Sequence, residues 1–215
     1  MTSEAGFRVF VDADVLAAPL TRTVLILAGT HPAAAFVPRW SLAVEAEANR
    51  HLRPGQTPID QVRERFDWGS EVIVPAATPA AARFAATSPK DRHVLAAAAR
   101  AGIALIVSRN VSDFGHADLE ATHTAVVHPD LFLAKAVTPD IYLDVLTDLA
   151  LARTREPNTA EGLHAALGAE HPRLHRAMRD VFPGVEATPG RHKPPAESFR
   201  GLPFNAGRMR FDHDT

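Results

Sequence analysis

Short apolar runs and longer amphipathic stretches alternate along the first 127 residues of the chain. Five runs have the length and the apolar content of buried strands, and turn-forming or polar residues close them. These runs are residues 7–11, 36–38, 71–74, 103–107 and 124–127. The stretches between them predict helices at residues 15–28, 42–52, 59–66, 79–86 and 93–101. The alternation predicts an α/β fold of three layers, α/β/α, with a mostly parallel central sheet.

Capping residues mark the ends of three of these helices. Asp14 is a suitable N-cap for the first helix, and Gly29 is a suitable residue to end it. Ser41 is placed to cap the second helix. Pro89 stands near the first turn of the last helix, and Gly102 follows its end.

The chain changes character after residue 128. Four further helices, separated by proline-containing turns, are expected at residues 130–135, 139–152, 159–167 and 172–181. Residues 183–215 are rich in Pro, Gly and Arg, a composition typical of disorder, and we expect an extended tail that lies against some other surface. We therefore divide the chain into a sheet-centred domain, a helical extension and a tail, which span residues 1–128, 129–182 and 183–215.

Composition excludes several classes of protein. Apolar residues make up 46% of the chain and the net charge is −2, which argues against a strongly basic nucleic-acid coat but not against a local basic groove. The chain has no cysteine, so disulfides, thiolate zinc sites and a cysteine nucleophile are excluded. The sequence shows no signal peptide and no apolar run of the ~18 residues that a membrane helix needs. We expect a cytoplasmic protein.

Four acidic residues stand where an α/β sheet concentrates its ligand sites. Asp12 ends the first strand, and Asp113 follows the fourth. Glu47 lies within the second helix, and Asp91 stands at the first turn of the helix at 93–101. The carboxyl ends of parallel strands meet at one edge, so these side chains are expected to converge. Carboxylates brought together repel each other, and hard oxygen ligands without cysteine point to Mg²⁺ or Mn²⁺.

Four stretches of the sequence resemble the PIN-domain nucleases, in particular the VapC-like toxins of bacterial toxin–antitoxin pairs. They are VDADVL, PLTRTVLILA, RWSLAVEAEANRHL and SPKDRHVLAAAARAGIALIVSRNVSDF, at residues 11–16, 19–28, 39–52 and 88–114. They occur in the order of the family and cover most of residues 7–127. The resemblance implies a metal-dependent endoribonuclease that hydrolyses RNA phosphodiesters with metal-activated water. It also implies an antitoxin protein as partner and a homodimer.

The resemblance assigns roles to individual positions. The residues that match the acidic cluster of the family, and so the catalytic and metal-binding positions, are Asp12, Glu47, Asp91 and Asp113. Supporting polar positions fall on Asp14, Ser108 and Asn110. Three cations beside the acids are expected to hold RNA: Arg50, Arg92 and Arg109. The chain departs from the family pattern at Asp14, where Asn or Ser is usual, and at Ser88 and Lys90, where close relatives carry acids.

Two other interpretations stay open at this point. VFVDADVL also resembles the opening of haloacid-dehalogenase-type phosphatases, with Asp12 as nucleophile and Asp14 as general acid. That interpretation needs a later lysine, such as Lys135, and two acids at the end of a strand, whereas Asp140 and Asp144 fall in a predicted helix. The other alternative is a degenerate PIN domain that acts as a binding module, against which the intact set of acids argues.

Two histidines, His171 and His175, stand four residues apart in the last predicted helix. This spacing places two imidazoles on one helix face, where they can bind a metal. No glutamate follows the first histidine as in the zinc-protease motif, so we expect a solvated helix face instead.

Overall fold

The computed structural model describes residues 6–65, 72–75, 83–190, 195, 197–206 and 209–212, and it is built around a six-stranded sheet. The strand order is β3-β2-β1-β4-β5-β6. The strands are β1 (Phe7–Val11), β2 (Phe36–Ser41), β3 (Ile73–Val74), β4 (Leu105–Val107), β5 (Ala125–Val127) and β6 (Phe199–Gly201). All neighbouring strands are parallel except β6, which runs antiparallel to β5. The sheet is therefore mostly parallel, as the alternation of elements predicts.

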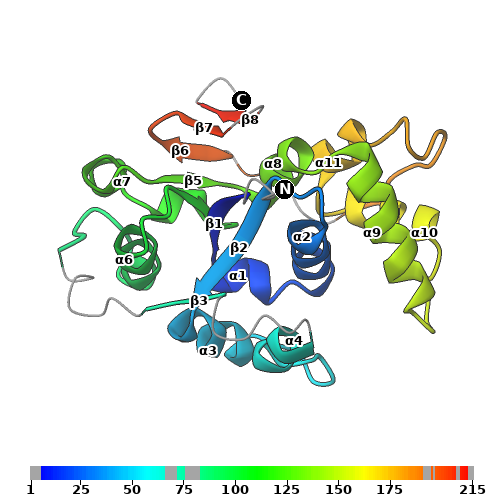
Figure 1. Ribbon diagram of the computed structural model, residues 1–215, viewed down its shortest axis with the longest axis horizontal. Helices are drawn as coiled ribbons and strands as arrows, with labels where there is room; N and C mark the ends of the chain where they lie inside the picture. The colour runs from blue at the N-terminus through cyan, green and yellow to red at the C-terminus, as the bar shows by residue number, and fades with distance from the viewer. Residues whose placement is uncertain are drawn as a thin grey trace.

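The helices form layers on both faces of this sheet. They are α1 (Ala13–Leu16), α2 (Pro19–Thr30), α3 (Leu42–Arg50), α4 (Ile59–Arg65), α6 (Arg92–Arg100), α7 (His116–Thr122), α8 (Pro129–Ala136), α9 (Pro139–Leu151), α10 (Ala160–Gly168) and α11 (Pro172–Ala177), with a 3₁₀ turn at η1 (Val111–Asp113). Helices α6 and α7 cover one face, and α2 and α8 cover the other (Figure 1). Helices α9, α10 and α11 pack outside α2 and α8. The prediction of an α/β/α fold with C-terminal helices is confirmed.

Continuous apolar runs form the strands because helices cover both faces of the sheet. Val9, Phe10 and Val11 in the central strand β1 are fully buried, and every residue of β4 and β5 is buried. Such a strand has no solvated face, so its polar residues fall where it ends. This arrangement leaves the carboxyl edge of β1 and β4 as the place where polar side chains gather.

The first predicted helix is wrong in its boundaries. Two helices stand in its place: Asp12 caps the short α1, and α2 begins afresh with Pro19 in its first turn. Asp14 lies inside α1 instead of capping it. Gly29 lies inside α2, where a Cβ atom would stand 2.6 Å from the ring of Pro38. The glycine therefore allows α2 to approach β2 closely and does not end the helix.

The second strand and its helix follow the prediction more closely. Strand β2 continues past residue 38 to Ser41, whose side chain accepts a hydrogen bond from the Val44 amide at 3.3 Å and caps α3 as expected. Of the strand expected at residues 71–74, the structure describes the pair Ile73–Val74. Half of the helix expected at residues 79–86 lies outside the described residues, and the described half, residues 83–86, is not helical.

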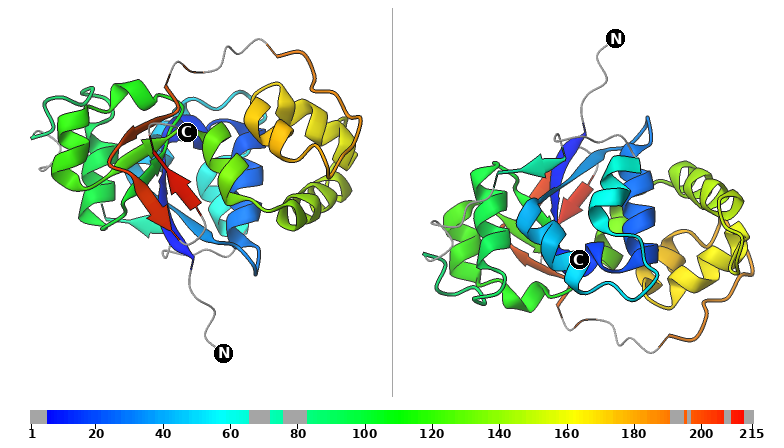
Figure 2. Two further views of the ribbon diagram at one scale, coloured as in Figure 1. Left: turned by 90° about the horizontal axis from the view of Figure 1, so that it is seen from above. Right: turned by 90° about the horizontal axis from the view of Figure 1, so that it is seen from below.

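The chain after residue 128 contains the four predicted helices, of which α11 ends four residues earlier than expected. Beyond them, the Thr188 amide donates to the Ala165 carbonyl at 2.9 Å, which ties the chain to α10. Strand β6 then extends the sheet, and β7 (Phe204–Ala206) and β8 (Met209–Phe211) form a hairpin that packs above α8 (Figure 2).

The division at residues 128 and 182 stays a prediction. Among the described helices, none combines the length and apolar character needed to span a membrane.

Candidate active site

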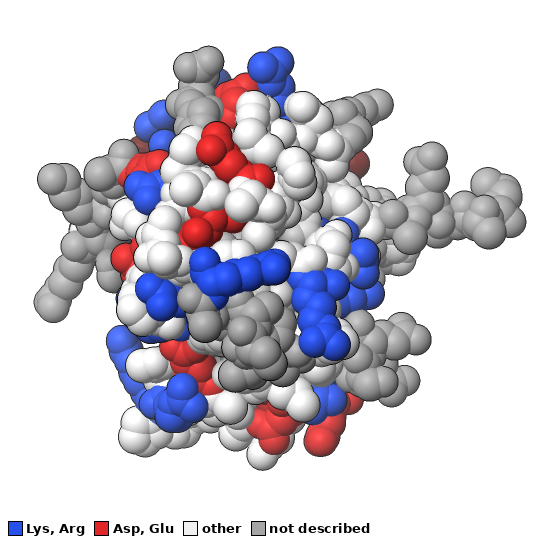
Figure 3. Space-filling view, turned by 90° about the vertical axis from the view of Figure 1, so that its left-hand side faces the viewer, with Lys and Arg blue, Asp and Glu red and all other residues white. Residues whose placement is uncertain are grey.

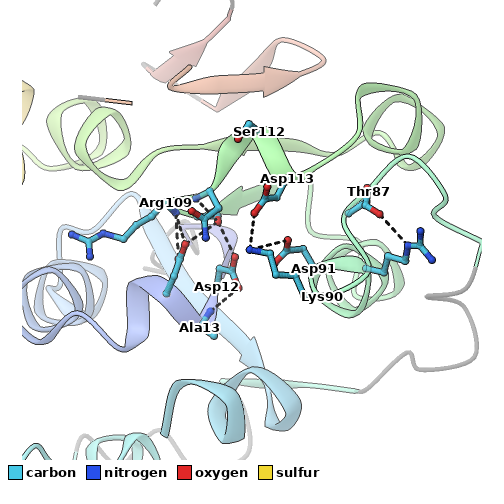
Figure 4. A network of polar contacts seen from close by, with 12 residues as sticks. Asp12, Ala13, Thr87, Lys90, Asp91, Arg109, Ser112 and Asp113 are labelled. Atoms are coloured by element: carbon cyan, nitrogen blue, oxygen red, sulfur yellow. Dashed lines mark hydrogen bonds and ion pairs between the residues drawn. The ribbon is translucent and has the colours of Figure 1, made fainter. Parts of the chain in front are cut away.

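Asp12 stands at the carboxyl edge of the sheet, between the end of β1 and the start of α1. Its Oδ1 accepts a hydrogen bond from the Ala13 amide at 2.7 Å, and its Oδ2 accepts one from the Ser108 hydroxyl at 2.8 Å (Figure 4). Ser108 directly follows the neighbouring strand β4, so the parallel register brings it to the same edge. The carboxylate is 4% exposed. Its orientation is therefore fixed by two partners, one at the start of α1 and one directly after β4.

Asp14 lies beside Asp12 on the first turn of α1. Its carboxylate accepts hydrogen bonds from the Arg109 amide at 3.0 and 3.2 Å, and the Ser108 hydroxyl is 3.4 Å from its Oδ2. Ser108 thus bridges the two carboxylates. Asn110 is exposed, and its contribution here is its amide, which donates to the Ser108 hydroxyl at 3.1 Å. All three predicted supporting residues therefore meet at this edge, but Asn110 does so through its backbone.

A second pair of acids, Asp91 and Asp113, lies across from Asp12. The ammonium nitrogen of Lys90 is 2.8 Å from the Asp113 Oδ2 and 4.0 Å from the Asp91 Oδ2, so one cation lies between both carboxylates (Figure 4). Asp91 is the N-cap residue of α6 and is 7% exposed. Its Oδ2 is buried and has no hydrogen-bond partner in the described part of the chain. A buried acceptor without a hydrogen bond is costly, which marks this atom as a candidate ligand.

Two acids of α3 point to different neighbours, and only one of them joins this region. The Oε2 atom of Glu47 is 3.2 Å from the Nε2 atom of His93 on α6. Glu45 is 6% exposed and accepts hydrogen bonds from the Trp40 indole at 3.0 Å and from the Arg63 guanidinium at 3.1 Å. Glu45 is thus neutralised within the packing of α3, β2 and α4, whereas Glu47 contacts His93 and its charge acts on Asp12 and Asp91.

Burial and mutual repulsion raise the pKa values of three of these carboxyls. Burial, and then the charge of Asp14 with a smaller contribution from Glu47, raises the pKa of Asp12 to about 8. Burial, followed by the charges of Asp12, Asp113 and Glu47, raises the pKa of Asp91 to about 7. The pKa of Asp14 rises to about 6, chiefly by burial, although the Arg109 amide and charge oppose this shift. Five carboxylates therefore act on one another here, and their charge is only partly balanced.

The donor chemistry of this cluster suits a hard divalent cation. Its candidate ligands are carboxylate oxygens, which Mg²⁺ and Mn²⁺ prefer, and Asp91 supplies a buried oxygen without a hydrogen bond. The spacing is less favourable: among the described residues, no three His, Asp or Glu side chains are close enough together to hold an ion. The ammonium of Lys90 provides the positive charge between Asp91 and Asp113. The chemical nature of these side chains therefore fits a divalent cation, and the Lys90 ammonium lies between two of the candidate ligands, Asp91 and Asp113.

The three cations expected to hold RNA differ in their surroundings. The Arg92 guanidinium donates to the Thr87 carbonyl at 3.0 Å and so holds the loop before α6. The Arg109 guanidinium pairs with Glu170 at 2.7 Å, beside the acids. Arg50 is exposed in the last turn of α3. Their roles in RNA binding stay predictions. The hydrogen bond of Arg92 to the Thr87 carbonyl is typical of a residue that stabilises a loop.

The solvated helix face expected at His171 and His175 is wrong for the first of these residues. His171 is fully buried, and its Nε2 atom is 2.8 Å from the Thr21 hydroxyl of α2. The ring of His175 stacks instead on His164, with 4.1 Å between ring centroids. The two imidazoles have different partners, because the helix packs one against α2 and the other against α10. His171 therefore packs the C-terminal helices against the sheet-centred part of the chain, and His175 joins α11 to α10.

The residues that a phosphatase would need lie elsewhere. Lys135 donates to the Arg210 carbonyl at 2.8 Å, beside the β7–β8 hairpin. Asp144 pairs with His31, which follows the end of α2, at 3.3 Å, and Asp140 lies in the first turn of α9. Lys135 and Asp144 therefore have their polar partners away from Asp12. The phosphatase alternative is therefore not favoured.

The fold and this cluster together describe an α/β/α protein with a group of acidic side chains at the carboxyl edge of a mostly parallel sheet. The chain is 35% identical over 98 residues to a protein of Mycobacterium tuberculosis (strain ATCC 25618 / H37Rv) named "Putative ribonuclease VapC50". The match covers 44% of this chain and 57% of that protein, so the chain spans little more than half the length of this relative. No protein-family model and no solved structure matches the chain. The similarity supports a relationship to VapC-like proteins over part of the chain.

Proposed function

We propose that the chain is a divalent-metal-dependent endoribonuclease of the PIN type and the toxin half of a toxin–antitoxin pair. The observation that carries this proposal is the gathering of Asp12, Asp14, Glu47, Asp91 and Asp113 in one region, where burial and mutual repulsion raise the pKa values of Asp12, Asp14 and Asp91. Grouped carboxylates repel one another without a cation, and with a bound metal ion they can support hydrolysis of a phosphodiester. The similarity to the VapC protein of M. tuberculosis supports the same activity.

In this proposal, each residue has a role that follows from its contacts. Asp12 and Asp91, the two most deeply buried acids of this cluster, hold the cation, and Glu47 and Asp113 complete its surroundings. Ser108 fixes the Asp12 carboxylate, and His93 orients Glu47. A bound Mg²⁺ or Mn²⁺ would neutralise charge on a phosphate and lower the pKa of a water molecule.

The proposed substrate is single-stranded or looped RNA, because its bases are accessible to a protein surface. Hydrolysis is expected to leave a 3′-hydroxyl and a 5′-phosphate, as the family resemblance implies. An antitoxin protein, a homodimer and a cytoplasmic location belong to the same proposal.

The test is cleavage of a pool of structured RNAs by the purified protein with Mg²⁺, with Mn²⁺ and with a chelator. We expect cleavage with either metal and loss of cleavage in the chelator. Asp12→Asn is expected to abolish cleavage, and unchanged cleavage by this variant would refute the proposal.

A matched pair on α3 separates catalysis from folding. Glu47→Gln is expected to reduce cleavage strongly while the thermal midpoint stays close to that of the wild type. Glu45→Gln is expected to lower the thermal midpoint, because it weakens the contacts to Trp40 and Arg63. Equal effects of the two substitutions on cleavage per folded molecule would contradict the assignment of Glu47.

A further inference from the structure

A cleft of about 530 Å³ opens directly beside the acidic cluster. It lies between the start of α2, the chain that follows α3, and helices α9 and α10 of the C-terminal extension. Its volume falls in the range of roughly 300–1,000 Å³ that is typical of small-ligand sites. The cleft exists only because α9 and α10 pack on the sheet-centred part of the chain, so local sequence patterns do not reveal it.

The inner end of the cleft is continuous with the candidate active site. Asp14 lines the cleft and shares the Ser108 hydroxyl with Asp12. Arg109 also connects the two regions: its amide binds Asp14, and its guanidinium pairs with Glu170 on the cleft wall. A polymer with one phosphate at Asp12 can therefore place its next nucleotide in the cleft.

The cleft carries more positive than negative groups. Arg53, Arg109 and Arg153 line it together with two acids, Asp14 and Glu170. The chain as a whole has a net charge of −2, and the face formed by α6 and α7 shows acidic and basic side chains intermixed among its described residues (Figure 3). A local excess of arginine beside an acidic cluster favours a ligand with phosphate groups.

The remaining walls suit a flat base. Apolar side chains of α2, α9 and α10, including Leu20, Leu149 and Leu163, line the cleft between the arginines. Guanidinium groups bind phosphate and also stack on bases, so this combination fits nucleotides better than a free anion. Helix α2 begins at the cleft with Ala18 as its N-cap residue, which provides no side-chain cap, and its partial positive charge adds to the attraction for phosphate.

We propose that this cleft binds one or two nucleotides of single-stranded RNA next to the scissile phosphate, and that α9 and α10 thereby select the substrate. The inference rests on the proposed ribonuclease function. Arg153 and Arg109 hold phosphates, and the half-buried side chains of Leu20 and Leu149 contact a base. A base must leave its stack to enter a cleft between helices, which disfavours duplex RNA. Glu170 limits the affinity, because its charge opposes a phosphate beside Arg109.

The first experiment measures binding without cleavage. A fluorescein-labelled eight-nucleotide RNA of mixed sequence is titrated with Asp12→Asn protein in Mg²⁺ at several salt concentrations, and fluorescence anisotropy gives Kd. Adding Arg153→Ala is expected to raise Kd about five- to tenfold and to reduce the salt slope by roughly 0.7–1, as the loss of one phosphate contact predicts. Adding Glu170→Gln is expected to lower Kd. The corresponding RNA duplex is expected to bind more weakly than the single strand.

Two control variants distinguish a phosphate contact from a structural effect. Arg155 is exposed and stands two residues from Arg153, but it does not line the cleft, so Arg155→Ala is expected to change Kd less than twofold. The Arg153 guanidinium donates to the Pro157 carbonyl at 2.7 Å, so Arg153→Lys loses that contact but keeps the charge, and most of the affinity is expected to return. Equal Kd values for Arg153→Ala and Arg155→Ala would overturn the proposal, and so would tighter binding of the duplex.

The second experiment locates the RNA directly. The same RNA containing 4-thiouridine is irradiated on the Asp12→Asn protein, and the cross-linked peptides are identified by mass spectrometry. Cross-links are expected in α9 and α10, whereas cross-links confined to α6 and α7 would refute the inference. Cross-links in the cleft without any cleavage by the wild type would refute the nuclease proposal alone. Cleavage that coexists with a Kd independent of Arg153 would refute the cleft proposal alone.

Discussion

Replacement of Asp12 with asparagine is expected to stabilise the metal-free protein, although it removes a proposed metal ligand. Asp12 is buried beside Asp14, and these surroundings raise its pKa from 3.8 to about 8. The folded protein therefore holds a proton on this carboxyl that the unfolded chain releases at neutral pH. Asparagine keeps the shape and has no charge to bury. Its carboxamide can still pair with the Ala13 amide and the Ser108 hydroxyl.

The size of the effect follows from the pKa difference. Each pKa unit corresponds to about 1.4 kcal/mol, so the shift costs the wild type up to about 4 kcal/mol at pH 7. Water at the edge of the sheet and proton sharing with Asp14 and Asp91 reduce the expected gain to roughly 1–3 kcal/mol. For a chain of this size, such a gain raises the thermal midpoint by roughly 3–10 °C. Because the folded pKa is raised, the stability that Asp12 contributes is full below pH 3.8 and is lost as pH rises through about 8.

The assay is urea unfolding of wild type and Asp12→Asn in chelator at pH 5, 7 and 9. The difference in unfolding free energy is expected to favour the variant and to grow from pH 5 to about pH 8. The exposed residue Asp148 of α9 provides the control, because Asp148→Asn is expected to give a small difference that does not depend on pH. A variant less stable than the wild type at pH 7, or a difference independent of pH, would refute the electrostatic account of the cluster.

Three further predictions concern the cation in the cluster, a buried cap and the buried histidines. Lys90→Met removes the ammonium between Asp91 and Asp113. It is expected to lower the Kd for Mn²⁺ at least threefold, as measured by calorimetry. An unchanged or higher Kd would show that the lysine does not compete with the metal. Asp130 is buried, and its Oδ1 accepts hydrogen bonds from the Arg173 and Leu174 amides at the start of α11. Asp130→Ala is therefore expected to lower the free energy of unfolding in urea by about 2–4 kcal/mol, and Asp130→Asn by less. Equal losses in the two variants would contradict this capping role. Burial lowers the pKa of His171 to about 3 and that of His164 to about 4, so the stability they contribute is present above pH 6.5 and is lost as pH falls toward 3. His171→Gln is expected to reduce the loss of unfolding free energy at acid pH, measured by urea unfolding. An unchanged pH dependence would show that the buried His171 does not cause this loss.

The five parallel strands and the polar edge where they end were predictable because their signals are local. An apolar run buried on both faces must end in polar residues, so Asp12 and Ser108 mark the edge of the sheet directly in the sequence. Ser41 likewise caps its own helix through a contact three residues away. These features depend on neighbouring residues along the chain, which a sequence displays.

The features that were not predictable depend on packing between distant segments. In the sequence Gly29 has the pattern of a helix-ending glycine, but the structure requires glycine there because Pro38 of β2 lies too close for a side chain. His171 resembles a surface residue until α11 packs against α2. Strand β6 joins β5 from more than 70 residues away, and the arginine-lined cleft forms only when α9 and α10 meet the start of α2. No local pattern encodes these contacts.

The central claim is that the carboxylates at the edge of β1 and β4 bind a divalent cation for RNA hydrolysis. Anomalous diffraction from crystals grown with Mn²⁺ tests this claim most directly, because it locates the ion without reference to activity. The account predicts a manganese peak between Asp12 and Asp91, with Glu47 and Asp113 beside it, and its loss in Asp12→Asn crystals. Saturating Mn²⁺ with no peak among these residues, or with a peak that the Asp12→Asn substitution leaves in place, would contradict it.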